Sequence, residues 1–64
     1  MSIKISMAAA RINAGMSQNT AAQKIGVSLS TLKNWEKKRT SPKANHIGKI
    51  CEVYKMPYDA IFFD

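Results

Sequence analysis

Residues 18–36 read QNTAAQKIGVSLSTLKNWE and predict two short helices joined by a tight turn. Ser17 and Ser28 precede the two helical stretches, and serine is a favoured N-cap residue. Gly26 follows the first stretch and is expected to end that helix and bend the chain. A turn of this kind lets the second helix cross the first at a steep angle. Val27 is expected to fill the core beneath the turn.

The second of these helices has two chemically different faces. At 100° per residue, Leu32 and Trp35 point to one side. The opposite side carries Ser30, Lys33, Asn34 and Lys37, with Leu29 at its edge. In the major groove of DNA, lysine can donate to guanine, asparagine can pair with adenine, and leucine can contact a thymine methyl group. Trp35 could instead stack on an unpaired base, but its spacing from Leu32 favours the core.

The flanking sequence predicts three further helices. The alanine-rich residues 5–14 favour a helix that ends at Gly15. Another is expected from Ser41, as N-cap with Pro42 in the first turn, to about Lys55. A last short helix is expected over residues 58–62, and no segment alternates well enough to predict a strand. The expected core consists of Met7, Ala10, Met16, Ala21, Ile25, Val27, Leu32, Trp35, Ile47, Ile50, Cys51, Tyr54, Met56, Ile61 and Phe62.

The charge of the chain is uneven and strongly basic. Its 64 residues form one domain, 1–64, with ten Lys and Arg against four Asp and Glu, a net charge of +6. Such a surplus indicates a polyanionic partner, either nucleic acid or an anionic membrane surface. No apolar run approaches the roughly 18 residues that span a bilayer, which favours nucleic acid. The basic residues concentrate in one region: Lys33, Lys37, Lys38, Arg39 and Lys43.

The cysteine and histidine content gives no indication of a catalytic or metal-binding site. Cys51 is the only cysteine and His46 the only histidine, so neither an internal disulfide nor a Cys/His metal cluster is expected. This cysteine usage fits a reducing cytoplasm. Since no catalytic pair can be assembled, we expect a protein that is not an enzyme and that uses no cofactor or metal.

The sequence resembles the Cro and lambda-repressor-like helix-turn-helix proteins, also called the Xre family. The motifs that carry this resemblance are RINAGMSQ at 11–18, AQKIGVS at 22–28, TLKNWE at 31–36 and SP at 41–42. The ending MPYDAIF at 56–62 resembles the family's fifth helix. The resemblance covers about residues 4–63. It implies an all-α, compact five-helix domain in which helices two and three form the helix-turn-helix.

The resemblance also implies roles for individual residues. Arg11 and Glu36 are expected to form a structural ion pair, and Gln18 is expected to contact phosphate at the start of the second helix, where free N–H groups attract anions. The family often has a glycine after its recognition helix, whereas this chain has Lys37-Lys38-Arg39. The expected base contacts are Ser28, Leu29, Ser30, Lys33 and Asn34, and the expected DNA-backbone contacts are Ser17, Gln18, Lys37, Lys38, Arg39, Lys43 and Asn45.

These observations favour a cytoplasmic, nucleoid-associated regulator of transcription that binds double-stranded DNA in a sequence-specific way. We expect a phage- or prokaryote-type repressor that acts by promoter occlusion, as a homodimer on an inverted repeat, with residues 58–63 as the candidate dimer surface. The alternative is a protein-interaction module that modulates another regulator, as an antitoxin-like partner does. The basic cluster would then be only a solvated face, and the stretch with Tyr58, Phe62 and Phe63 would bind the partner.

Overall fold

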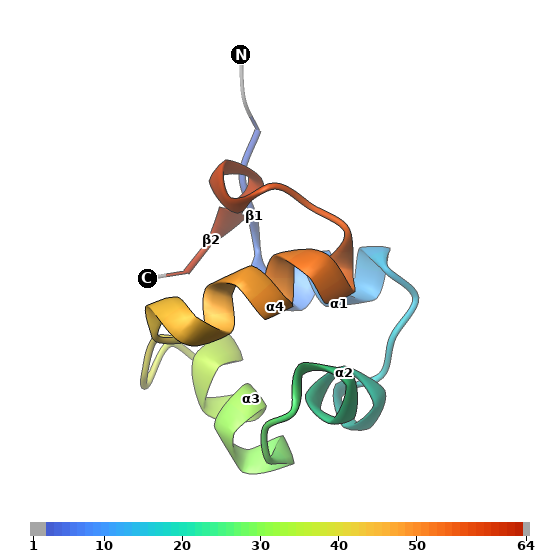
Figure 1. The fold of residues 1–64 in the computed structure, drawn as a ribbon, viewed down its shortest axis with the longest axis vertical. Helices are drawn as coiled ribbons and strands as arrows, with labels where there is room; N and C mark the ends of the chain where they lie inside the picture. The colour runs from blue at the N-terminus through green and yellow to red at the C-terminus, as the bar shows by residue number, and fades with distance from the viewer. Residues whose placement is uncertain (1–2, 64) are drawn as a thin grey trace.

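The computed structural model describes residues 3–63 and places four α-helices around one core. Figure 1 shows helix α4 lying across the molecule in front of α1, with α2 and α3 below and strands β1 and β2 above. None of the helices in this part of the chain is long and apolar enough to cross a membrane. The elements in chain order are β1 (Ile5–Ser6), α1 (Met7–Asn13), α2 (Gln18–Ile25), α3 (Leu29–Glu36), α4 (Ala44–Tyr54), a 3₁₀ turn η1 (Tyr58–Ala60) and β2 (Ile61–Phe62).

Local capping sets the bounds of the central helix pair. The Ser17 hydroxyl accepts a hydrogen bond from the Thr20 N–H, and the Ser28 hydroxyl accepts one from the Thr31 N–H, both at 3.1 Å. Gly26 ends α2 in the left-handed region, at φ 91°, and its N–H donates to the Ala22 carbonyl. Each cap satisfies a backbone group that a helix end leaves without a partner. The α2–turn–α3 unit is confirmed where the sequence predicted it.

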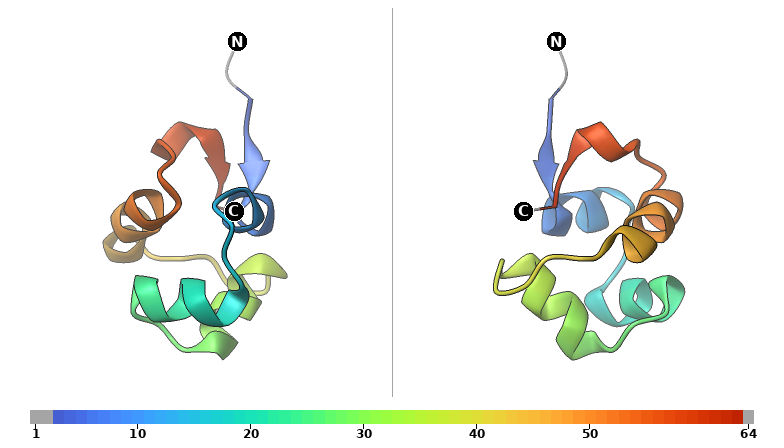
Figure 2. Two further views of the ribbon diagram at one scale, coloured as in Figure 1. Left: turned by 90° about the vertical axis from the view of Figure 1, so that its right-hand side faces the viewer. Right: turned by 60° about the vertical axis from the view of Figure 1, so that its left-hand side comes forward.

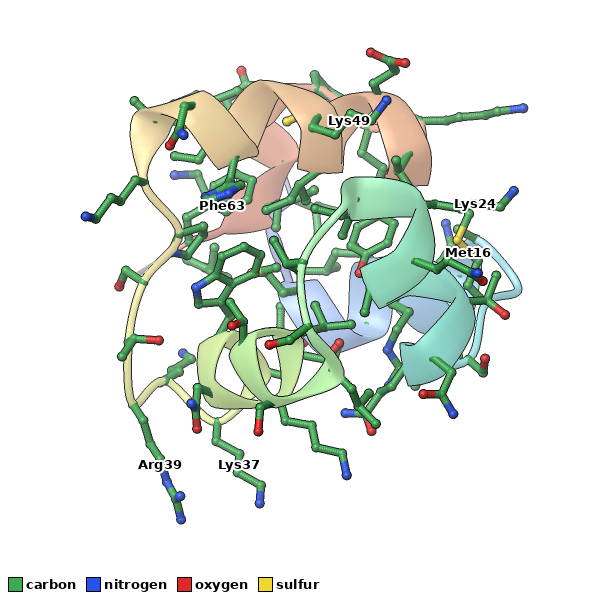
Figure 3. All side chains as sticks on the ribbon, turned by 60° about the horizontal axis from the view of Figure 1, so that its bottom comes forward. Met16, Lys24, Lys37, Arg39, Lys49 and Phe63 are labelled. Carbon is green, nitrogen blue, oxygen red and sulfur yellow. The ribbon has the colours of Figure 1, made fainter. Side chains whose placement is uncertain are left out.

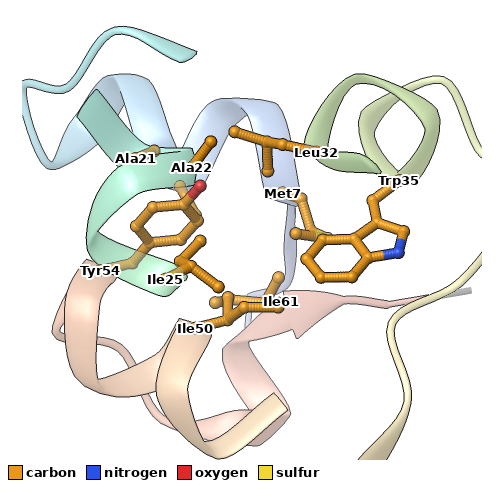
Figure 4. Close-up of a cluster of buried hydrophobic side chains, with 10 residues drawn as sticks. Met7, Ala21, Ala22, Ile25, Leu32, Trp35, Ile50, Tyr54 and Ile61 are labelled. Atoms are coloured by element: carbon orange, nitrogen blue, oxygen red, sulfur yellow. The ribbon is translucent and has the colours of Figure 1, made fainter. Parts of the chain in front are cut away.

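The core lies between α2, α3 and α4, and α1 and β2 close it. Leu32 and Trp35 are buried, as their shared helix face predicted, and they pack with Met7, Ile50 and Ile61 in Figure 4. The buried residues are Met7, Ala10, Ala21, Ala22, Ile25, Leu32, Trp35, Ile50, Tyr54 and Ile61. Ala21 and Ala22 are small, so they leave room for neighbouring helices to approach α2 closely. The buried side chains of Leu32 and Trp35 hold α3 against this core.

The expected fifth helix and the expected absence of strands are both wrong. Residues 58–60 make a single 3₁₀ turn, and Ile61–Phe62 then pair in parallel with Ile5–Ser6. This pairing joins the two ends of the chain and gives their backbone N–H and C=O groups partners. Phe62, expected in the core, is 44% exposed, because adjacent strand residues face opposite sides and Ile61 takes the buried side.

Two expected helix starts also differ from the structure. The first helix begins at Met7, with Ser6 as its N-cap, because Ile5 and Ser6 belong to β1. Helix α4 begins at Ala44, not after Ser41, and its N-cap residue Lys43 makes no side-chain capping bond. Pro42 is buried, so this residue anchors an extended loop against the molecule instead of opening the helix.

Candidate nucleic-acid interface

Helix α3 presents a polar face to solvent because its apolar face is anchored in the core. Ser30, Lys33 and Lys37 are exposed, and Leu29 and Asn34 are partly buried at the edges of the same face. Figure 3 shows Lys37 and Arg39 projecting away from the molecule beside α3, whereas Lys49 lies on α4 at the opposite side. The predicted base-contacting side chains are therefore brought to one surface, although Asn34 is less open than Lys33.

The Ser28 hydroxyl, a predicted base contact, is engaged at the start of α3. It accepts from the Thr31 N–H and lies 2.8 Å from the Thr31 hydroxyl. One of the two hydroxyls must donate to the other, so a single O–H remains free in this pair. Ser17 is engaged in the same way at the start of α2, where its hydroxyl donates to the Thr20 hydroxyl at 3.1 Å. Both serines serve as N-caps. The contacts of their hydroxyls with the hydroxyls of Thr20 and Thr31 were not predicted from the sequence.

A largely shielded ion pair holds the C-terminal end of α3 to α1. Arg11 Nε donates to Glu36 Oε2 at 2.8 Å and Nη2 donates to Glu36 Oε1 at 3.3 Å. The two side chains are only 13% and 6% exposed. Arg11 Nη1 also donates to the Met16 carbonyl at 2.9 Å, which holds the loop between α1 and α2. The expected pair is present, and it is a shielded contact between elements rather than a surface pair.

Gln18 extends this pair to α2. Its Nε2 donates to Glu36 Oε1 at 3.0 Å, so Glu36 receives three hydrogen bonds from two side chains. One amide hydrogen of Gln18 and the first backbone N–H groups of α2, ahead of the Thr20 N–H that Ser17 caps, remain for an incoming anion. Its contact with phosphate stays a prediction. The sequence pattern did not indicate that Gln18 also links α2 to α3.

The loop after α3 is shaped by a lysine in an unfavourable backbone region. Lys38 has φ 61°, and the N–H groups of Lys38 and Arg39 donate to the carbonyls of Trp35 and Asn34 at 3.1 and 3.0 Å. This is the bonding pattern that usually places glycine at the left-handed position. Lys37, Lys38, Arg39, Lys43 and Asn45 are all exposed. The loop therefore carries four cations beside the outward face of α3.

Three further titratable side chains lie inside or against the core. The His46 ring, on α4, packs against Trp35 with ring centroids 5.3 Å apart. Burial raises the pKa of the Tyr54 phenol to about 12; the nearby Glu36 charge adds to the rise, and Arg11 opposes it. Burial also raises the pKa of the Cys51 thiol, which disfavours the reactive thiolate. Within residues 3–63, no three His, Cys, Asp or Glu side chains gather where they could hold a metal ion.

Comparison with known proteins gives one match that spans most of the chain. Residues 7–61 match the model of a protein family described as Helix-turn-helix. The matched range runs from the first residue of α1 to the first residue of β2 and so includes every helix of the fold. No curated protein and no solved structure matches the chain.

Proposed function

The chain belongs to the helix-turn-helix family of Xre and lambda-repressor-like DNA-binding regulators, and we propose that it is a Cro-like repressor that occludes promoters. In this proposal α3 enters the major groove, and α2 lies across the DNA backbone above it. The observation that supports it most directly is the split of α3, with Leu32 and Trp35 buried and Ser30, Lys33 and Lys37 exposed.

Sequence preference would come from the exposed side chains of α3. Lys33 donates to guanine acceptors, and Asn34 forms a two-point contact with adenine. Leu29 adds only apolar contact, whereas Ser30 and the Ser28–Thr31 pair each add one hydroxyl donor of short reach. Because Asn34 is partly buried, its reach is shorter than that of Lys33. Lys33 is therefore the main base-reading residue of the proposal.

Affinity would come from the cations that follow α3. Lys37, Lys38, Arg39 and Lys43 neutralise phosphates and release condensed counterions, so binding falls steeply as salt is raised. Ser17 and Gln18, at the start of α2, and Asn45, at the start of α4, complete the backbone contacts. These contacts fix the register of α3 but carry no sequence information themselves.

A single module of this size binds weakly, so the proposed repressor acts as a homodimer on an inverted repeat. The two half-sites would lie about one helical turn, roughly 34 Å, apart. Binding requires no chemistry and no cofactor: positioning two such helices over a promoter is enough to exclude a polymerase.

Selection of bound sites from random duplex DNA tests this proposal. We expect an enriched motif with two related halves. Lys33→Ala should then weaken binding to that motif by about 1–3 kcal/mol and relax the preference at one position. Lys49→Ala removes the same charge from the opposite side of the molecule, on α4, and serves as the matched control. If the two variants lose the same affinity and keep the same preference, α3 does not read the bases.

One observation favours a second function, that of a protein-interaction module. Tyr58 and Phe62 are large apolar side chains that remain exposed at the chain ends. A module that binds another regulator through them would show no enriched motif in the selection, and its affinity for random DNA would be the same for every sequence.

A further inference from the structure

A hollow opens beside the β1–β2 sheet, between the 3₁₀ turn η1 and the loop that follows α3. Its volume is about 340 Å³. Small-molecule sites in proteins occupy roughly 300–1,000 Å³, so this one is large enough for a ligand of one or two rings. We propose that the hollow binds a small aromatic monocarboxylate, of which benzoate is the simplest example. The residues that line it are Lys4, Ser41, Tyr58, Ile61, Phe62 and Phe63.

Aromatic rings form the apolar part of the hollow. The Tyr58 and Phe63 rings stack with their centroids 5.7 Å apart and their planes inclined by 13°. Ile61 is only 2% exposed, so the hollow reaches down to the core. Tyr58 and Phe62, in contrast, keep 65% and 44% of their surfaces exposed. A ligand ring that covers these side chains removes apolar surface from water and can pack against them in an offset or edge-to-face arrangement.

The polar part of the hollow suits a single negative charge. Lys4 is exposed, its Nζ lies 5.7 Å from the centroid of the Phe62 ring, and it takes part in no ion pair within residues 3–63. Ser41 is also exposed, and its hydroxyl can donate a hydrogen bond. A carboxylate would pair with these two groups while its ring covers the aromatic side chains. Asp59, exposed next to Tyr58 in the chain, disfavours a ligand with two negative charges.

A second hollow, of about 470 Å³, lacks this combination. It lies between the ends of α1, α2 and α4 and is lined by Asn13, Ala14, Met16, Lys24, Val53, Tyr54 and Lys55. Its one aromatic residue, Tyr54, is 3% exposed, so little ring surface is open to a ligand. The second hollow therefore offers cations without an aromatic wall, and it provides an internal comparison for the first.

A ligand in the first hollow can influence the proposed DNA contacts through the loop that follows α3. Ser41 lies two residues from both Arg39 and Lys43, and Figure 2, right, shows this loop in yellow below the end of β2 and beside α3. A bound carboxylate lowers the positive potential near these cations, so it should weaken DNA binding. DNA must then weaken carboxylate binding by the same factor. This effect rests on the proposed function, whereas binding of the carboxylate does not.

A titration of the whole isotope-labelled chain with sodium benzoate, followed by its amide chemical shifts, tests the site. Sodium chloride keeps the ionic strength constant. The hollow is open and the probe is small, so we expect a Kd of about 1 mM. Saturable shifts should concentrate at Ser41 and residues 58–63. Acetate has the charge without the ring, and benzyl alcohol has the ring without the charge, so each should bind at least several-fold more weakly than benzoate.

Three variants separate the contributions of charge and ring. Lys4→Met should weaken benzoate binding at least several-fold and leave the affinity for benzyl alcohol nearly unchanged. Tyr58→Ala should weaken the binding of both ligands. Lys24→Met is the matched control, since it removes the same charge beside the second hollow, and it should bind benzoate as the wild type does. The proposal is overturned by an absence of saturable shifts, by acetate binding as tightly as benzoate, or by normal benzoate binding in Lys4→Met.

DNA affinity measured with and without benzoate, again at constant ionic strength, examines the effect on the proposed function. Saturating benzoate should lower the affinity of the wild type at least two-fold and leave that of Lys4→Met unchanged. An unchanged wild type contradicts the effect on DNA. If the chain binds no DNA while benzoate still gives saturable shifts, the proposed function fails and the carboxylate site stands.

Discussion

Replacing Glu36 with glutamine should strongly destabilise the protein while preserving the shape of the side chain. The carboxylate receives the two Arg11 bonds and the Gln18 bond, at 2.8, 3.3 and 3.0 Å. Without its charge, the Arg11 guanidinium stays shielded with no counter-ion. Breaking a buried pair from one side costs about 3–5 kcal/mol. We expect about 3 kcal/mol, because Arg11 keeps its bond to the Met16 carbonyl.

That loss is large for a chain of this length. A 64-residue domain has about 3–10 kcal/mol of total stability, and 1 kcal/mol shifts its Tm by about 4–8 °C. Glu36→Gln should therefore lower the Tm by roughly 12 °C or more. Urea unfolding can be followed by the fluorescence of Trp35, the only tryptophan, which is buried.

Two further variants complete the experiment. Arg11→Met combined with Glu36→Gln removes both charges, so it should be more stable than the sum of the two single losses predicts. Glu52→Gln breaks the exposed Lys49–Glu52 contact at 3.6 Å and should cost less than about 0.5 kcal/mol. If Glu36→Gln costs no more than Glu52→Gln, the shielded pair of Arg11 and Glu36 does not stabilise the fold.

The remaining predictions concern a buried phenol, two strained lysines and the cationic loop. The pKa of Tyr54 is raised from 10.0 to about 12, so the unfolded chain loses this proton first as pH rises. The free energy of unfolding is therefore not reduced by this proton below pH 10, and it falls by up to about 2.7 kcal/mol as pH rises through 12. Tyr54→Phe removes the titrating phenol. In urea unfolding, the free energy of unfolding should therefore fall more from pH 8 to pH 11 in the wild type than in Tyr54→Phe, and equal falls in the two proteins would contradict this. Lys38 and Lys55 have φ 61° and 55°, so glycine at either position should add about 0.5–1 kcal/mol of stability in thermal unfolding. Only Lys38→Gly should also weaken DNA binding, and a loss of affinity in Lys55→Gly would argue against the proposed interface. Lys37→Ala should reduce the slope of log affinity against log salt by about 1, with the loss shared by all DNA sequences.

The α2–turn–α3 unit and the division of α3 into two faces could be predicted from local sequence patterns. Ser17, Gly26 and Ser28 act within three or four residues along the chain, because caps and turns depend on neighbouring backbone groups. The spacing of Leu32 and Trp35 is equally local, since it follows from the helix period. The ion pair of Arg11 and Glu36 was expected from the family resemblance, and not from any local rule.

The arrangement of the terminal segments and the loops depends on contacts between residues far apart in the chain. Ile5–Ser6 pair with Ile61–Phe62, and a two-residue strand is too short to show alternation in the sequence. The local pattern Ser41-Pro42 favours a helix that starts there. Because Pro42 is buried in the loop, α4 begins only at Ala44. Gln18 meets Glu36 across 18 positions of the chain. In each case the partner is distant in sequence, so its contribution exists only once the core has brought the segments together.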